Sequence, residues 1–258
     1  MHIYRYFIVI DDIWEPESWD TIKLALVVND QGSGVITTTR KFEVAAAAGE
    51  VYKLNSLSHN DSKSLFYKRI FGNQGKCPDG ETVELLNKII KKCRGVPLAI
   101  ITMASLLVGK SEGEWTEVYD SIGFGKGNRH VENTMKILSF SYYDLPSHLR
   151  TCLLCLSVFP EDYVIDRDLL IWKWIVEGFI HEKQGKRLFE LGEQYFCDLI
   201  NRSMIHVQGS RWNGVVISCR IHDIVLELIR SLSFEENFVD LLDSNVEHQQ
   251  KAIIMCVG

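Results

Sequence analysis

The chain has 258 residues, 46% of them hydrophobic and 24% charged, which is ordinary for a soluble globular protein of one large domain or a few small ones. The net charge of −6 gives no electrostatic reason to expect nucleic acid or an anionic membrane as a partner, and no segment shows the pattern of a signal peptide or of a membrane-spanning helix. Seven scattered cysteines favour a reducing compartment over a disulfide framework, so we expect a cytoplasmic protein.

The first 55 residues alternate predicted strands and helices. The apolar run at residues 6–10 predicts a strand buried on both faces, because a run without alternation suits a covered parallel sheet. A helix with Trp19 on its apolar face follows, then a β-branched strand at residues 35–39, a short helix ending at Gly49 and a third strand at residues 51–54. Short connections imply parallel pairing, so we predict half of an open α/β domain over residues 1–55.

The pattern becomes helical after residue 55. Ser58 and Asp61 form a capping-box pattern that opens a helix ending at Gly72. The segment ETVELLNKIIKKC places its apolar residues on one helical face, and Pro97 stands where a helix start tolerates proline, ahead of LAIITMASLLV. We therefore expect a helical subdomain over residues 56–130.

A further set of helical segments begins near residue 131. It is followed by a predicted hairpin, in which MIHVQ turns at GSRWNG into VVISCRI, and by a last helix from about Asp223. Helices, a two-stranded wing and another helix follow one another in the order of a winged-helix domain, which we assign to residues 131–233. Residues 234–258 are predicted to be a linker. The predicted fold class is thus α/β followed by all-α with a small wing.

Two adjacent acids, Asp11 and Asp12, follow the first predicted strand in a Walker B pattern. Ligands of open α/β folds bind outside the carboxyl ends of strands, where one acid can hold Mg²⁺ and its neighbour can orient or deprotonate an attacking water. Arg40 follows the next strand, where a cation can meet a phosphate. Each signal by itself is weak, since a strand ending in two acids is as often a turn, and Arg40 can be a solvated residue at a helix start.

Six segments together carry a family resemblance. FIVIDDIW, GSGVITTTR, CRGVPLAI, FSYYDLP, CLLCLSVFPEDYVI and RIHDIVLELI occur in the order and rough spacing of the NB-ARC region of plant nucleotide-binding leucine-rich-repeat disease resistance proteins. The chain resembles this region over essentially its whole length, and Trp14 with the unbroken FPEDY resembles the coiled-coil subclass. The resemblance implies part of a P-loop NTPase-type parallel sheet, then a helical subdomain and a winged-helix subdomain.

The resemblance also implies site residues. Asp11 would be the metal-associated acid that holds Mg²⁺, and Asp12 the catalytic acid tied to hydrolysis. Arg40 would read the terminal phosphate of ATP, Pro97 would pack near the adenine, and His222 would contact the β-phosphate of ADP. We expect Asp11, Arg40, Pro97 and His222 to line one cleft.

Two positions, each directly before a proposed site residue, depart from the family pattern. Val96 stands where leucine is usual and Ile221 where methionine is usual, both conservative exchanges of apolar bulk. A plainer interpretation of the Ile-His-Asp segment is a helix N-cap by Asp223, and both interpretations can hold together.

The phosphate loop of the family is the missing part. G-x-x-x-x-G-K-[ST] should lie well upstream of the Walker B strand, and only residues 1–5 precede it here. The single GKS, residues 109–111, has Ala104 in place of the first glycine and follows a helix rather than a strand, so Gly109 is better interpreted as a helix C-cap. We expect a truncated chain with an incomplete phosphate site.

The resemblance implies an ADP/ATP-binding molecular switch with Mg²⁺, which acts in plant defence and rests in the ADP form. The family is a P-loop ATPase of the STAND type, but without the phosphate loop we expect impaired nucleotide binding and no turnover by this chain. The alternative is a non-nucleotide-binding interaction module, or a truncated regulatory fragment, that associates with itself or with other immune receptor domains. The linker at residues 234–258 would lead toward leucine-rich repeats.

Two other sites are weaker candidates. His148, Cys152 and Cys155 lie at helical spacing, but no fourth ligand has a spacing known for zinc, so core packing is favoured. The helix LLIWKWIVEGF has only Arg167 and Lys173 as nearby bases, which predicts poor attraction to DNA phosphates.

Overall fold

The computed structural model describes residues 5–26, 32–72, 80–122, 130–182, 185–212 and 214–238. The chain divides into two compact units, Met1–Asn55 and Ser56–Gly258, and each is described by itself. The predicted linker lies outside the described residues from position 239 onward. No helix in the described ranges is both long and apolar enough to cross a membrane.

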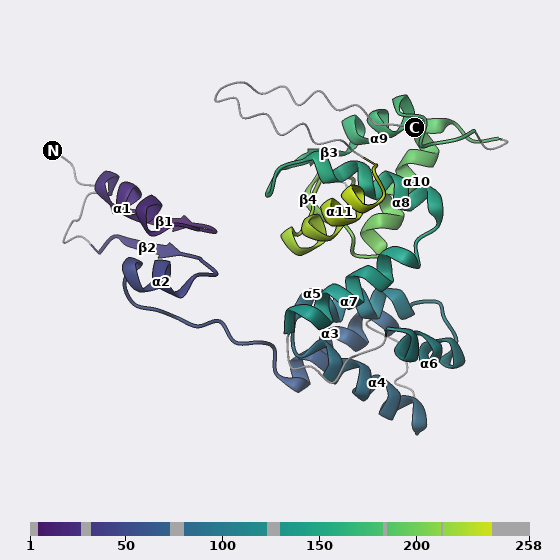
Figure 1. The fold of residues 1–258 in the computed structure, drawn as a ribbon, viewed down its shortest axis with the longest axis horizontal. Helices are drawn as coiled ribbons and strands as arrows, with labels where there is room; N and C mark the ends of the chain where they lie inside the picture. The colour runs from purple at the N-terminus through teal and green to yellow at the C-terminus, as the bar shows by residue number, and fades with distance from the viewer. Residues whose placement is uncertain are drawn as a thin grey trace. The chain divides into compact units, whose positions relative to one another are not determined.

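The first unit is a β–α–β–α arrangement. Its elements are β1 (Phe7–Ile10), α1 (Pro16–Ala25), β2 (Gly34–Thr37) and α2 (Phe42–Ala48), and the two strands pair in parallel (Figure 1). Ile13, Trp19 and Val44 form its small core, and Trp19 donates from Nε1 to the carbonyl oxygen of Ala47 at 3.1 Å. The parallel pairing follows from the short crossover helix, as the sequence predicts.

One face of this two-stranded sheet is open. Ile10 and Val35 pack against the small core, whereas Phe7 and Val9 are 69% and 60% exposed and Ile36, paired with Val9, is 49% exposed. The prediction of a strand buried on both faces is therefore wrong for the described chain, because α1 and α2 both pack against the face of Ile10 and Val35. We call Phe7, Val9 and Ile36 the open face.

The third predicted strand is also wrong. Residues 51–58 have no regular secondary structure, and the first sheet in the described chain consists of β1 and β2 alone. Tyr52 and Leu54 are exposed. A strand needs a hydrogen-bonding neighbour and a covered face, and this connecting segment has neither, whatever its β propensity.

The second unit begins with a group of helices around one core. They are α3 (His59–Phe71), α4 (Glu81–Cys93), α5 (Pro97–Leu107), α6 (Glu112–Ser121) and α7 (His130–Tyr143). The predicted helix signals are confirmed: the Ser58 hydroxyl accepts from the Asp61 N–H at 3.1 Å, Gly72 ends α3, and Pro97 is the first residue of α5. Phe66, Met103 and Ile137 are among the fully buried core residues.

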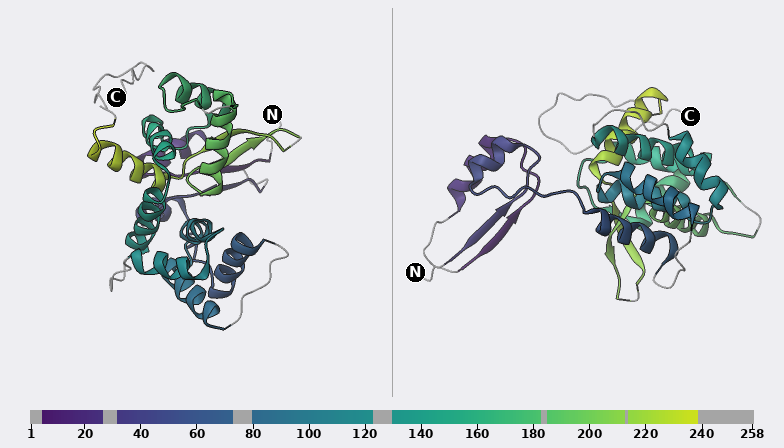
Figure 2. Two further views of the ribbon diagram at one scale, coloured as in Figure 1. Left: turned by 90° about the vertical axis from the view of Figure 1, so that its right-hand side faces the viewer. Right: turned by 90° about the horizontal axis from the view of Figure 1, so that it is seen from below.

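The remaining elements form the winged part. They are α8 (Ser147–Leu154), the 3₁₀ helix η1 (Cys155–Val158), β3 (Ile165–Asp166), α9 (Arg167–Val176), α10 (Leu188–Asn201), β4 (His206–Ser210), β5 (Val216–Arg220) and α11 (Asp223–Glu235). The predicted hairpin β4–β5 is confirmed and projects from the helices in both views of Figure 2. The short β3, which the sequence pattern did not reveal, pairs with β5 to give an antiparallel sheet of order β3-β5-β4.

Helix α7 connects the two cores of the second unit. Ile137 belongs to the core of α3–α7, while Leu138 and Tyr142 on the same helix belong to the core of the winged part. Consecutive residues such as 137 and 138 point about 100° apart on a helix, so one helix can serve two cores.

Polar side chains join the same two parts. Arg69 of α3 donates from Nη2 to the carbonyl oxygen of Asn201, at the end of α10, at 2.8 Å. Asp144, directly after α7, accepts from Lys110 at 3.1 Å and from Arg202 at 3.0 Å. We call this cluster the polar joint, and its members are Arg69, Ser105, Lys110, Asp144, Asn201, Arg202 and Ser203.

Candidate functional site

The two acids of the Walker B pattern lie at the carboxyl end of β1, beside the end of β2. Thr38 ties the two strand ends together. Its hydroxyl donates to Asp11 Oδ1 and accepts from the Asp12 N–H at 2.8 Å, and its backbone N–H and C=O pair with Ile10 O at 3.0 Å and the Ile13 N–H at 2.9 Å. One threonine therefore fixes the path of residues 10–13, a role that the sequence pattern did not reveal.

Asp12 turns the chain at this point. Its φ is 54°, in the left-handed region that aspartate tolerates better than most residues but that still carries some strain. The turn leads into Ile13, which is buried in the small core. As a result Asp11 is exposed and Asp12 half-buried at the end of the strand, the arrangement that a metal or phosphate ligand outside the strand ends would require.

Arg40 lies beside the second acid. Its Nε is 3.8 Å from Asp12 Oδ1, and its guanidinium carbon is 5.0 Å from the centroid of the Trp14 ring. Trp14 in turn donates from Nε1 to Asp12 Oδ2 at 2.9 Å. The structure thus brings Asp11, Asp12 and Arg40 together, and adds Thr38 and Trp14 to them.

The residues present fit a magnesium phosphate. Mg²⁺ prefers oxygen ligands and takes one or two protein carboxylates with phosphate oxygens and water completing the octahedron, which suits exposed Asp11. The Arg40 guanidinium supplies planar donors for a phosphate oxygen. Within the described residues no group of three or more metal-ligating side chains occurs, so a cation here would depend on the phosphate for further ligands.

Pro97 follows a tight backbone crossing. Gly95 has φ of +72°, and a Cβ there would lie 2.4 Å from the carbonyl oxygen of Leu57, so glycine is required. The Leu57 N–H donates to the Gly95 carbonyl at 2.9 Å. This crossing fixes the start of α5 and leaves Pro97 exposed at its first position.

His222 is the N-cap of α11. Its ring Nδ1 accepts a long hydrogen bond, 3.4 Å, from the Ile224 N–H. The prediction that Asp223 is the cap is wrong: Asp223 is the first residue inside the helix, where its charge favours the helix dipole instead. The imidazole of His222 is exposed, and Nε2 is the ring nitrogen that takes no part in this cap.

The candidate residues fall in both units. Asp11, Asp12 and Arg40 belong to the first unit, and Pro97 and His222 to the second. Within the second unit, Leu98 packs against the core that contains Ile221, so the residues next to Pro97 and His222 border one core. The single cleft containing all the candidates stays a prediction.

The GKS segment connects two helices. Gly109 has φ of +77° just after α5, and Ser111 caps α6 by a reciprocal pair of contacts with Glu114. The hydrogen bonds from the Ser111 backbone and hydroxyl lower the pKa of Glu114. Lys110 pairs with Asp144 of the polar joint. All three residues thus have structural roles at helix ends.

The alternative metal and DNA sites also have structural explanations. Cys152 and Cys155 are buried in the core of the winged part, where burial raises the pKa of the Cys152 thiol, and the His148 ring lies 4.6 Å from that of Tyr195. The basic side chains of helix α9 form ion pairs with acids of the protein. Arg167 Nη2, for example, lies 2.8 Å from Asp168 Oδ1.

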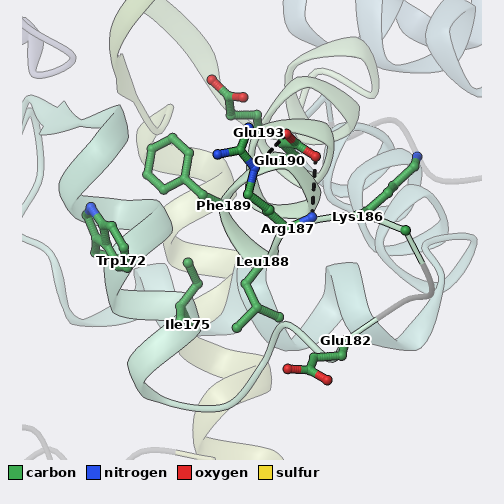
Figure 3. A pocket seen from close by; sticks show the side chains of 10 residues that line it. Trp172, Ile175, Glu182, Lys186, Arg187, Leu188, Phe189, Glu190 and Glu193 are labelled. Carbon is green, nitrogen blue, oxygen red and sulfur yellow. Dashed lines mark hydrogen bonds and ion pairs between the residues drawn. The ribbon is translucent and has the colours of Figure 1, made fainter.

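A groove along α9 and α10 was not predicted from the sequence. Figure 3 shows Trp172, Ile175, Leu188 and Phe189 lining it, with charged side chains at its rim, and its volume is about 1110 Å³. Exposed Leu169, Trp172 and Val176 lie on one face of α9, and Trp172 of that face lines the groove. None of the candidate site residues lines it.

Comparisons with known proteins match both parts of the chain. The NB-ARC domain family matches residues 1–76, and the disease resistance protein winged helix domain family matches residues 158–229. Disease resistance protein RPP13 of Arabidopsis thaliana is 36% identical over 245 residues, covering 94% of this chain and 29% of RPP13.

Two further relatives are similar to the same extent. Disease resistance RPP13-like protein 4 of Arabidopsis thaliana is 36% identical over 255 residues, which cover 95% of this chain and 30% of that protein. Disease resistance protein PIK6-NP of Oryza sativa subsp. japonica is 35% identical over 255 residues, which cover 92% of this chain and 24% of that protein. The chain spans less than a third of the length of these curated relatives.

Proposed function

Because the chain belongs to the plant disease resistance proteins and carries their NB-ARC and winged-helix domains, we propose that it is an ADP/ATP-binding switch module of a cytoplasmic immune receptor. The observation that supports this most is the cluster at the strand ends of the first unit, where Asp11, Asp12 and Arg40 lie together. Acids and a cation at this edge are what a Mg²⁺-bound nucleotide needs.

Each residue of the cluster has a proposed task. Asp11 holds Mg²⁺, which when bound neutralises phosphate charge. Asp12 accepts a hydrogen bond from a water positioned for attack, and Arg40 donates to the terminal phosphate. Because Arg40 lies next to Asp12 at 3.8 Å, a phosphate and this carboxylate compete for the same guanidinium.

Pro97 and His222 complete the proposed site from the second unit. Pro97 is exposed at the first turn of α5, where its ring can pack on adenine. His222 donates from Nε2 to the β-phosphate of ADP while its Nδ1 caps α11, so one side chain couples the ligand to the winged part. A ligand that contacts two rigid units differently in two arrangements shifts the population between them.

Calorimetric titration of ADP with Mg²⁺ tests the proposal. The 258 residues contain no G-x-x-x-x-G-K-[ST] segment, so we expect weak binding by them alone and tighter binding when a phosphate-loop segment of that type is fused ahead of residue 1. In the fused protein, Asp11→Asn should remove the Mg²⁺ dependence and His222→Ala should weaken ADP binding. If the fused protein binds neither ADP nor ATP, the switch proposal is wrong.

A second function is favoured by the open face. Phe7, Val9 and Ile36 form an exposed apolar surface on a sheet whose β1 has β2 as its single neighbour in the described chain. Such edges and faces are protein-binding sites. The second function is therefore that of a module that pairs with other receptor domains through this face and binds no nucleotide. In that case ADP should not change the association.

A further inference from the structure

Trp14 contacts two members of the proposed nucleotide site at once. Its indole Nε1 donates to Asp12 Oδ2 at 2.9 Å, and its ring centroid lies 5.0 Å from the guanidinium carbon of Arg40. Lys41 Nζ lies 5.9 Å from the same centroid. The side chain is 42% exposed, so core packing does not account for it.

We propose that Trp14 is a positioning residue that holds the Asp12 carboxylate and the Arg40 guanidinium next to each other in a fixed orientation. The proposal rests on the switch function proposed above, in which Asp12 and Arg40 act on the attacking water and the terminal phosphate. Trp14 itself contacts neither the attacking water nor the terminal phosphate. It acts through Asp12 and Arg40, which do.

Tryptophan supplies both contacts from one side chain. The indole combines an N–H donor for the carboxylate with the π face that attracts a guanidinium most strongly, whereas phenylalanine lacks the donor and leucine lacks both. The two contacts use different parts of the ring system, so they do not compete. Trp14 can therefore hold the Asp12 carboxylate and the Arg40 guanidinium side by side.

The residues on either side of Trp14 contact the end of β2 and the segment after it. Ile13 is buried in the small core and its N–H donates to the Thr38 carbonyl at 2.9 Å. On the other side Glu15 pairs with Lys41 at 2.9 Å, which ties the start of α1 to the residue after Arg40. Buried Ile13 and its hydrogen bond to Thr38 therefore hold the backbone before Trp14 next to the end of β2.

The ring matters because the ion pair alone is weak. Arg40 Nε and Asp12 Oδ1 are 3.8 Å apart and the Arg40 side chain is 49% exposed, so water screens their attraction. When a terminal phosphate draws the Arg40 guanidinium away from Asp12, the Asp12 carboxylate can accept a hydrogen bond from the attacking water instead. During that exchange the Trp14 ring can remain under the guanidinium and keep it at the site.

Nuclear magnetic resonance of the 258-residue chain tests the geometry without any ligand. A guanidinium over an indole face experiences its ring current, so the Arg40 Nε–Hε resonance, assigned with Arg40→Lys, should lie upfield of those of solvated arginines. Trp14→Leu should move it to the solvated position, and Trp14→Phe should keep part of the shift. Trp212→Leu, which removes a tryptophan that is 98% exposed, is the matched control.

The second contact has its own signal. Asp12→Asn should change the Trp14 indole N–H resonance, because the acceptor loses its charge. If Trp14→Leu leaves the Arg40 Nε–Hε resonance where it was while the amide spectrum shows an intact fold, the proposal is overturned. The Trp212→Leu spectrum should retain the Arg40 shift, and loss of the shift in that variant would also contradict the assignment to Trp14.

Nucleotide affinity separates this inference from the function on which it rests. In the protein fused to a phosphate loop, Trp14→Leu should weaken ATP binding by about two- to fivefold and ADP binding less, since a single cation–π contact at an exposed site is of this size. Equal affinities of the variant and the parent for ATP would refute positioning. If the parent binds no nucleotide, the switch function fails, and the Arg40 resonance still decides whether Trp14 holds the pair.

Discussion

At the scale of single residues, Thr38 and Asp12 show how much of the candidate site depends on one hydroxyl. The Thr38 side chain donates to Asp11 and accepts from the Asp12 N–H, while Asp12 holds φ of 54°. A left-handed residue persists only when its surroundings compensate the strain. The hydrogen bonds of Thr38 are that compensation, so the orientation of both acids depends on it.

Replacing Thr38 by valine, which has nearly the same shape, should therefore loosen the acids. We expect the first unit to lose about 1 kcal/mol of unfolding free energy, because the Asp12 N–H and the Asp11 carboxylate lose a shared partner at an exposed site. Hydrogen exchange of residues 5–15, measured at increasing urea concentrations, gives this change in unfolding free energy. Thr38→Ser should retain most of the stability.

Thr21→Val is the control for this substitution. It removes an exposed hydroxyl that donates to the carbonyl of Glu17 one turn earlier in α1, at 2.9 Å. It should change the stability by less than about 0.5 kcal/mol. Equal losses in Thr38→Val and Thr21→Val would show that the Thr38 hydroxyl has no special role.

At the scale of elements, helix ends rather than helix faces form the polar joint. Helices α5, α7 and α10 end at Leu107, Tyr143 and Asn201, and the cations of the joint lie at these ends. Helix C-termini carry partial negative charge, which explains why basic side chains are favourable there. The basic side chains of the polar joint therefore offset the partial negative charge at helix ends, and the joint connects the winged part to the helices before it.

Arg69→Gln should weaken this connection. Arg69 donates from Nε to Ser105 Oγ at 2.9 Å as well as to the Asn201 carbonyl, and glutamine cannot reproduce both bonds. We expect a loss of about 1 kcal/mol in the unfolding free energy of the second unit, together with faster hydrogen exchange at the end of α10.

The neighbouring substitution Lys68→Gln removes the same charge from α3 at an exposed position. It should leave the exchange rates at the end of α10 unchanged. If both variants accelerate exchange there to the same degree, the effect is one of net charge and the joint is not a specific connection.

At the scale of the whole molecule, the open face sets the solution behaviour of the chain. Val9 and Ile36 are paired neighbours on β1 and β2, and with Phe7 they form an apolar surface at the side of a sheet with an edge strand. Exposed flat edges with apolar faces pair readily with other chains. The stability and association of the 258-residue chain are therefore linked to whatever covers this face.

We expect the purified chain to associate as its concentration rises. Size-exclusion chromatography with light scattering measures this, and Val9→Lys should reduce the association because a charge on an edge strand opposes pairing. Trp212→Lys, at an exposed apolar residue of the wing, should not reduce it. A parent chain that stays monomeric and resists heat as well as the version fused to a phosphate loop would contradict this expectation.

The same chain should not turn over ATP. Phosphoryl transfer depends mainly on holding the phosphates in line, and the 258 residues contain no loop of the G-x-x-x-x-G-K-[ST] type to do so. A coupled phosphate-release assay should give the background rate for the chain and for Asp12→Ala alike. A rate in the parent that disappears in Asp12→Ala would show that the chain is an ATPase without that loop.

Local chemistry in the sequence determined most of the elements. The cap at Ser58, the proline that opens α5 and the hairpin β4–β5 follow from residues a few positions apart, which is why pattern and propensity predicted them. The motifs likewise identified the acids and Arg40 as candidates, since each follows a predicted strand closely. The helix cap at His222 was missed because residue type favours aspartate as an N-cap, whereas the tertiary structure starts the helix one residue later, at Asp223.

Tertiary structure alone decided the rest. Residues 51–54 have the composition of a strand but no neighbouring strand, and Phe7 and Val9 have the composition of a core but no covering helix in the described chain. Thr38 reaches Asp12 across 26 positions of sequence, and Trp14 meets Arg40 only because β1 and β2 end side by side. Backbone propensity acts within a few residues, whereas burial, pairing and the geometry of a site depend on which distant segments meet.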